Sequence, residues 1–199
     1  MSTKERRERE KRQRREIIIS ATVELLKQEG IAGVSMDKIA EKAELSKGTL
    51  YLYFKNKEQL LSEIFWMRLN ILIDKLQTIM ESEGEFDELV KQVIQTVMDY
   101  FTENVDIFRF IYHSLPSSAY DFMKQIHQTV EDFKLRIQEM SNKFYRRFDK
   151  GQFYIKTEYL QTVLRGLIWG FLTEKFFGQS EIELDPDLIY RIFSRGVLK

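Results

Sequence analysis

The chain has 199 residues, of which 43 % are hydrophobic and 31 % charged, and its 31 basic residues balance 31 acidic ones. This mix is typical of a soluble globular protein of one or two domains, and the scarcity of glycine (9) and proline (2) predicts an all-α fold. The absence of cysteine excludes disulfides and thiolate metal sites. Without a signal peptide or an apolar stretch long enough to span a bilayer, we expect a cytoplasmic protein with no membrane partner.

The balanced net charge conceals an uneven distribution along the chain. Residues 1–60 hold 14 Lys and Arg against 10 Asp and Glu, whereas residues 61–199 hold 17 against 21. The two parts therefore face different partners, and the basic part suits an anionic one.

Residues 1–15 form a charged N-terminal arm without an apolar residue after Met1, so they cannot bury a face. Pairs such as Glu5 and Arg9, four residues apart, would support a partly helical arm. Contact with phosphates and simple solvation are both compatible with this composition.

Apolar periodicity predicts three helices in the next part of the chain. These helices are residues 16–29, 36–43 and 47–54. Gly30 is suited to end the first helix, while Ser35 and Ser46 are suited to cap the second and third. Leu50 and Phe54 should face inward.

Further helices follow, and no strand pattern or internal repeat is found. The predicted segments are 57–80, a helix from Phe86 to Phe101, a short piece ending at Pro116, 122–144, 160–171, and a last helix that Asp185 and Pro186 open. Asn56 should cap the long helix at 57–80, with Gln59 completing a capping box.

Two short helices joined by a tight turn are the geometry that places a second helix in the major groove of DNA. Gly48 weakens the third helix but lets its backbone approach a nucleic acid closely. Lys47 and Thr49 could reach base edges, and Tyr51 and Tyr53 could donate hydroxyls to phosphates. The predicted DNA-binding residues are Ser35, Ser46, Lys47, Gly48, Thr49, Tyr51, Tyr53, Lys55 and Lys57. The simpler interpretation of the charge pattern alone is a solvated face with tyrosines packed in the core.

The segment GIAGVSMDKIAEKAELSKGTLYLYFKNKEQLL, residues 30–61, closely resembles the N-terminal DNA-binding region of the TetR family of transcriptional regulators. The resemblance covers roughly residues 14–62. It implies nine or so helices, with a three-helix DNA-binding domain at 16–56 and a ligand-binding and dimerisation domain at 57–199. It also implies a homodimer on a palindromic double-stranded operator, and a repressor that a small molecule releases.

Two residues depart from the pattern of that family. Glu44 stands where the family usually has glycine in the turn, so it must accept a left-handed backbone or use a different turn. Leu52 stands at a frequent contact position, and we assign no DNA contact to it.

Aromatic residues in the larger part are candidates for an apolar effector pocket, although any single one is more often a core residue. The pocket candidates are Trp66, Phe101, Phe108, Tyr112, Phe122 and Trp169. They favour a hydrophobic or aromatic ligand, with Arg109, His113 and Arg165 available for a polar head group.

The last two helices are the candidates for the dimer interface. Gly166 and Gly170, four residues apart, would let helix backbones approach closely. The predicted interface residues are Leu160, Leu167, Gly166, Gly170, Phe171, Ile189 and Phe193.

No catalytic residue, metal site or cofactor is expected, because the two histidines, His113 and His127, have no metal-ligand pattern or nucleophile beside them. The sequence therefore predicts a ligand-responsive DNA-binding repressor rather than an enzyme. Two alternatives stay open: a DNA-localised protein-docking factor without a small-molecule inducer, and a carrier of apolar molecules.

Overall fold

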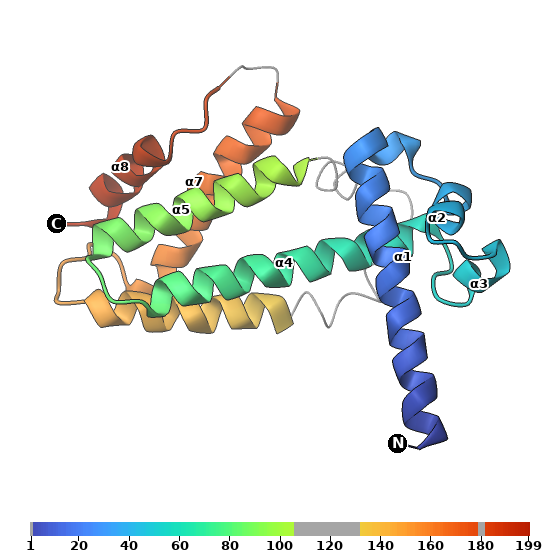
Figure 1. Ribbon diagram of the computed structural model, residues 1–199. Helices are drawn as coiled ribbons and strands as arrows, with labels where there is room; N and C mark the ends of the chain where they lie inside the picture. Colours follow the sequence, from blue (N-terminus) through green and yellow to red (C-terminus); the bar gives the residue numbers. More distant parts are fainter. Residues whose placement is uncertain (1, 106–131, 179–181) are drawn as a thin grey trace. The chain divides into compact units, whose positions relative to one another are not determined.

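The computed structural model describes residues 2–105, 132–178 and 182–199, and most of these residues are helical, as predicted. The helices are α1 Thr3–Gly33, α2 Met36–Lys42, α3 Lys47–Tyr51, α4 Lys57–Glu81, α5 Phe86–Glu103, helical residues 132–148, α7 Thr157–Phe177 and α8 Pro186–Val197 (Figure 1). The described ranges contain no strand, only an isolated bridge between Phe153 and Leu198. The predicted helix ending at Pro116 lies outside the described residues.

The chain divides into two compact units, and among the described residues the first ends at Arg68 and the second begins at Leu69. The division falls inside α4, whose first turns therefore belong to the first unit and whose remaining turns belong to the second. Within the described ranges, no helix is long and apolar enough to cross a lipid bilayer.

α1 is longer than predicted because the charged arm is helical from Thr3. Ser2 and Glu5 form a capping box, in which the Glu5 amide donates to Ser2 Oγ at 3.2 Å and the Ser2 amide donates to Glu5 Oε2 at 2.7 Å. Gly30 interrupts the helix with a left-handed φ of 65°, as its predicted helix-ending role requires, before a last turn to Gly33. This capping box was not predicted from the sequence.

The first unit has an apolar core to which α1, α2, α3 and the start of α4 each contribute. Ile18 of α1, Ile39 of α2, Leu50 of α3 and Leu60 of α4 are all fully buried. Phe54 is also fully buried, so the predicted inward orientation of Leu50 and Phe54 is confirmed.

α3 ends at Tyr51, three residues before the predicted end. Leu52 is its C-cap, and the Phe54 amide donates to the Leu50 carbonyl at 3.1 Å. This early end leaves room for Asn56 to cap α4, where its Oδ1 accepts from the Gln59 amide at 2.8 Å.

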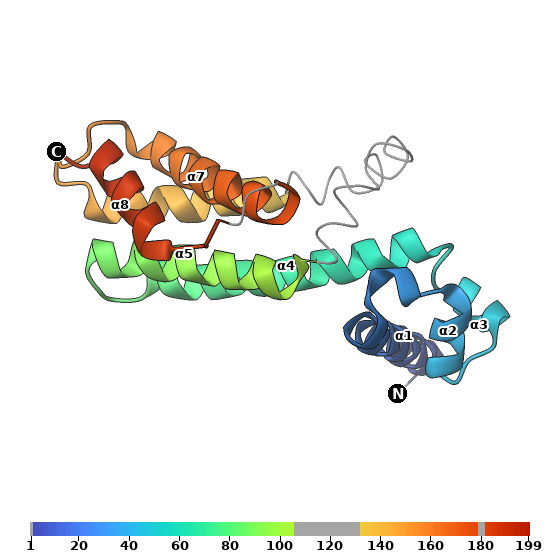
Figure 2. The same cartoon turned by 90° about the horizontal axis from the view of Figure 1, so that it is seen from above.

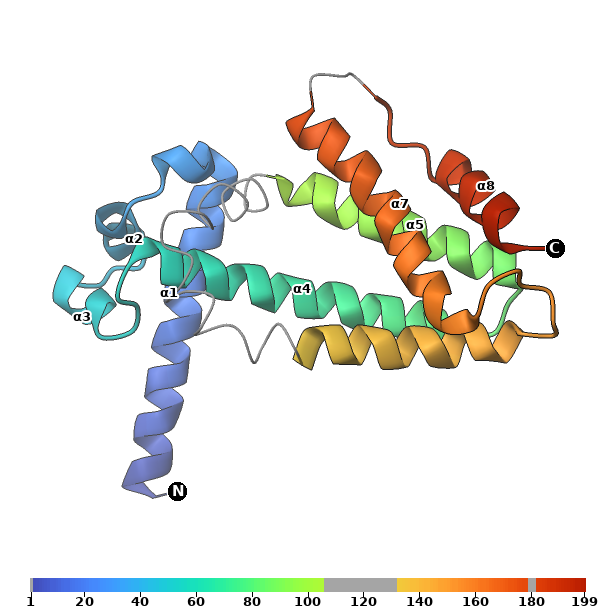
Figure 3. The same cartoon turned by 180° about the vertical axis from the view of Figure 1, so that it is seen from behind.

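The second unit contains the rest of α4 together with α5, residues 132–148, α7 and α8. α5 packs against α7 and α8, and these two helices also contact each other (Figures 2 and 3). Phe86 at the start of α5 packs against the rings of Phe144 and Phe153, with centroids 6.0 and 5.5 Å away. Tyr145 is buried beside them, and desolvation raises the pKa of its hydroxyl.

α8 begins as predicted at Asp185 and Pro186. Asp185 Oδ1 accepts from the amides of Asp187 and Leu188 at 2.9 and 3.1 Å, and Pro186 occupies the first turn.

Candidate nucleic-acid interface

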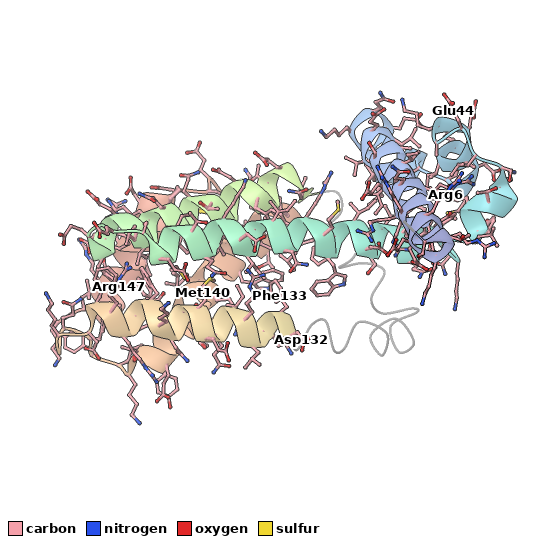
Figure 4. All side chains as sticks on the ribbon, turned by 60° about the horizontal axis from the view of Figure 1, so that its bottom comes forward. Arg6, Glu44, Asp132, Phe133, Met140 and Arg147 are labelled. Carbon is pink, nitrogen blue, oxygen red and sulfur yellow. The ribbon has the colours of Figure 1, made fainter. Side chains whose placement is uncertain are left out.

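The turn between α2 and α3 closes with the hydrogen-bond pattern of a Schellman motif. The Leu45 amide donates to the Ala40 carbonyl at 2.9 Å, and the Glu44 amide donates to the Glu41 carbonyl at 3.0 Å. Glu44 has a φ of 55°, so this residue accepts the left-handed backbone expected for glycine. The exposed Glu44 side chain is labelled in Figure 4. The short turn joins α2 and α3 into a helix-turn-helix unit.

Ser46 and Thr49 fix the start of α3. Ser46 Oγ accepts from the Thr49 amide at 3.1 Å and lies 2.8 Å from Thr49 Oγ1. Thr49 is half-buried, and the contact with Ser46 engages its hydroxyl in the cap. Ser35 has the same capping role in α2, where its Oγ accepts from the Lys38 amide at 3.3 Å.

Gly48 lies exposed in the first turn of α3, with no left-handed φ. A Cβ added there would meet only Ser46 Oγ, at 3.9 Å, which is an ordinary van der Waals distance. Nothing inside the chain therefore requires glycine at this position. This is consistent with a requirement from outside the chain, such as a closely approaching DNA backbone.

The exposed face of α3 and its C-cap presents Lys47, Tyr51 and Leu52. The ammonium of Lys47 pairs with Asp37 Oδ2 of α2 at 2.6 Å, and both side chains are more than half exposed. Such a pair contributes about 0–1 kcal/mol, so Lys47 can exchange it for a phosphate or a base at little cost. Tyr51 is 51 % exposed and Leu52 is 82 % exposed. The sequence predicts no DNA contact for Leu52, but its exposure makes it a candidate for apolar contact with a thymine methyl group.

Lys57 has an internal role that its sequence pattern does not predict. Its Nζ donates to the carbonyls of Ile31 and Val34, both at 2.7 Å, and so ties the start of α4 to the chain that follows the Gly30 kink. Tyr53 packs partly buried against the first-unit core, whereas Lys55 is exposed. Of these three predicted DNA-binding residues, Lys55 is the one that the structure presents to solvent.

Two ion pairs link α1 to other helices of the first unit. Lys42 Nζ of α2 lies 2.9 Å from Glu24 Oε2 of α1, and its hydrogen bond and charge lower the pKa of the Glu24 carboxyl. Arg15 Nε donates to Glu63 Oε1 at 2.7 Å, and its guanidinium carbon lies 4.6 Å from the centroid of the Phe54 ring.

The predicted pocket aromatics do not form one described cluster. Phe101 and Trp169 meet edge to face with ring centroids 6.0 Å apart in the second unit. Trp66 belongs to the first unit, where it contacts Phe65. The remaining predicted pocket residues and two of the polar candidates, Phe108, Tyr112, Phe122, Arg109 and His113, lie outside the described residues.

A groove of about 720 Å³ lies in the second unit between α4 and residues 132–148. Figure 4 shows Met140 on the side of its helix that faces α4. The groove is lined by Gln77, Met80, Glu81, Arg136, Glu139, Met140, Lys143, Phe144 and Arg147. Its apolar residues keep the spacing of an ordinary core, so sequence periodicity alone does not distinguish it from a filled interior.

The predicted dimer residues fall into two groups. Leu160, Ile189 and Phe193 are fully buried, so within one chain they pack into the core of the second unit. Gly166 and Gly170 are exposed on α7. Leu167 and Phe171 are half-buried beside them.

The described residues contain no cluster of three or more histidine, cysteine, aspartate or glutamate side chains that could hold a metal ion. His113 and His127 lie outside the described ranges.

Residues 18–64 match the family model of bacterial regulatory proteins of the tetR family. An uncharacterized HTH-type transcriptional regulator of Haemophilus influenzae is 34 % identical over 104 residues, covering 51 % of this chain and 56 % of that protein. This chain thus spans about half the length of the first curated relatives that it matches.

Two solved structures share the fold over nearly the whole chain. A TetR-family transcriptional regulator from Mesorhizobium loti matches with a TM-score of 0.70 and 19 % identity, covering 94 % of this chain and 98 % of that one. The regulator FadR from Bacillus subtilis, solved in complex with stearoyl-CoA, matches with a TM-score of 0.67 and 19 % identity, covering 90 % and 97 %. The helical architecture of both units therefore has close counterparts among solved regulators.

Proposed function

We propose that this chain, whose residues 18–64 match the family model of bacterial regulatory proteins of the tetR family, is a TetR-family transcriptional repressor that binds a palindromic operator as a homodimer and is released by a small apolar effector. The observation that carries the proposal is the unit of α2, turn and α3, in which the capped start of α3 presents Lys47 and Gly48 to solvent. Helices with this connection read base edges with the residues of their first turn.

The dimer part of the proposal is supported by one face of α7. Tyr159, Val163, Gly166 and Gly170 are all exposed and follow each other at steps of four, three and four residues, so they lie along one side of the helix. Exposed apolar residues beside two glycines suit close packing against the same face of a second chain. Val163→Arg should therefore shift the protein from dimer to monomer in analytical ultracentrifugation, and an unchanged dimer would rule out this face.

The effector part is supported by the groove between α4 and residues 132–148. Met80, Met140 and Phe144 supply apolar surface, and Arg147 supplies a cation at the edge. The Arg147 guanidinium carbon lies 4.5 Å from the centroid of the Phe148 ring, which holds the charge beside the apolar surface. The groove thus suits a molecule with an apolar chain and an anionic end, and the stearoyl-CoA bound by B. subtilis FadR is one such molecule.

The mechanism of release follows from linkage between the two sites. The protein has one conformation that binds the operator and another that does not. An effector lowers operator affinity only by as much as it prefers the second conformation over the first. Helix α4 connects the two units covalently and is the element through which we expect this coupling to act.

The test is selection of bound fragments from a random DNA library with the purified protein. The expected product is a palindrome whose half-sites are about one helical turn, ~34–36 Å, apart. If no sequence is enriched, and the protein binds all DNA alike with an affinity that falls as the salt concentration rises, the repressor proposal is overturned. That result would favour a DNA-localised docking factor. Stearoyl-CoA, with coenzyme A as its control, is the first effector to add to the selected complex.

A further inference from the structure

The first turns of α1 are highly charged, and the candidate DNA-binding residues of α2 and α3 do not include these charges. Residues 2–14 are all exposed, and α1 continues past α2 and α3 without another first-unit helix beside it (Figures 1 and 3). Residues 1–15 contain eight basic and three acidic side chains, a net charge of +5. This segment is a rigid and strongly basic extension of the DNA-binding unit.

The basic residues of the extension are not spread evenly around the helix. Lys4, Arg7, Lys11 and Arg14 follow at steps of three and four residues, so they form a basic stripe along one side. Within the described residues, none of the four makes an ion pair. Lys11 has Arg7 four residues before it and Arg14 three residues after it, and like charges at these spacings cost about 0.2–0.5 kcal/mol each, which Glu8, three residues before Lys11, offsets only in part. A bound polyanion would relieve this repulsion.

The other side of the extension alternates basic and acidic side chains. At 100° per residue, Glu5, Glu8 and Glu10 all lie outside the sector of the basic stripe and are interleaved with Arg6, Arg9 and Arg12, although Lys4 and Arg14 at the edges of the stripe also have a glutamate four residues away. Arg6 Nε, for example, lies 3.0 Å from Glu10 Oε1. The asymmetry distinguishes the basic stripe from a uniformly solvated charged helix.

The basic stripe continues into the side of α1 that faces the first-unit core. At 100° per residue it is in line with Ile18, which is fully buried, and Arg15 at its end lies against Phe54 and Glu63. The stripe is thus held in a fixed direction by the same core that positions α3. Lys4 and Arg14 are ten residues apart, a rise of ~15 Å, over which one strand of B-DNA presents about four phosphates.

We propose that the basic stripe binds the phosphate backbone of DNA flanking each operator half-site, as a second DNA-contacting element besides α3; this rests on the proposed DNA-binding function. Its contacts are to phosphates, so they add affinity and salt dependence without reading sequence. A lipid surface does not fit, because residues 2–16 contain no apolar side chain and an interfacial helix needs an apolar face.

The test compares two full-length variants that each lose three positive charges. The stripe variant carries Lys4→Gln, Arg7→Gln and Lys11→Gln, and the control variant carries Arg6→Gln, Arg9→Gln and Arg12→Gln. Glutamine is a good helix former, so both variants should keep the helix content of the unmodified protein in circular dichroism. The probe is the duplex obtained in the library selection, with ten base pairs added on each side.

The measurement is the dissociation constant over a range of KCl concentrations. The stripe variant should lose ~0.9 from the slope of log K against log salt for each contact removed, up to ~2.7 per chain, and should protect less flanking DNA in a footprint. The control variant should lose less than half as much slope and keep the footprint. Equal losses in the two variants, or no loss in either, would overturn the proposal. If the unmodified protein binds no duplex, the proposed function fails and this inference fails with it.

Discussion

Replacing Gly48 with alanine tests whether glycine is required at this position for folding stability or for DNA binding. The added Cβ meets only Ser46 Oγ at 3.9 Å, so the first unit should accept the methyl group without movement. Alanine also loses less backbone freedom on folding, which should stabilise the protein by about 0.5 kcal/mol. For a chain of 199 residues this raises the melting temperature by ~1–2 °C in a thermal scan.

The effect of Gly48→Ala on DNA binding should have the opposite sign. If the backbone of Gly48 lies in van der Waals contact with DNA, a methyl group there costs about 1–3 kcal/mol, a loss of roughly 5- to 150-fold in affinity. Fluorescence anisotropy with the selected duplex at fixed salt measures this loss, and Gln28→Ala, at an exposed position of α1, is the matched control. A Gly48→Ala protein that is equally stable and binds as tightly as the unmodified one would refute the reasoning.

Lys57→Met removes both hydrogen bonds to the carbonyls of Ile31 and Val34 and should lower the free energy of unfolding by about 2 kcal/mol. Lys55→Met, at an exposed position, should leave the melting temperature unchanged. Equal melting temperatures of the two variants would contradict the internal role of Lys57. Glu44→Gly removes the strain of a side chain at a left-handed φ of 55° and should raise the free energy of unfolding in urea by about 1 kcal/mol. An equal gain with Glu44→Gln would mean that the charge of Glu44, and not its backbone conformation, is responsible. Asp37→Asn frees Lys47 and removes a negative charge beside it, so operator affinity should rise several-fold at low salt and converge with that of the unmodified protein at high salt. An affinity that Asp37→Asn does not change at any salt concentration would exclude Lys47 from the interface.

Most of the helices could be predicted because their boundaries are set by local hydrogen bonds. Ser35, Ser46, Asn56 and Asp185 each cap a helix within three residues of themselves, and such bonds depend only on neighbours in the sequence. The all-α fold is likewise confirmed, and the predicted resemblance to the TetR family agrees with the family-model match over residues 18–64.

The role of a polar side chain was harder to predict when its partners are distant in sequence. Lys57 bonds to carbonyls 26 and 23 residues before it, and nothing in its local pattern distinguishes this from an exposed lysine such as Lys55. The burial of the apolar residues Leu160, Ile189 and Phe193 within one chain could not be predicted either. Periodicity marks an apolar face without showing whether the same chain or a second one covers it.

The helix order, the capped helix-turn-helix segment and the alternation of charge along the arm can be predicted from the amino-acid sequence, since they depend on contacts within about one helical turn. The packing of the helices was needed to find that Lys57 braces the end of α1, that Gly48 meets no obstacle inside the chain, and that the basic stripe shares the buried side of α1. These properties depend on which surfaces other helices cover. Helices pack through contacts between residues that are far apart in sequence, and the periodicity of one segment does not show which residues these are.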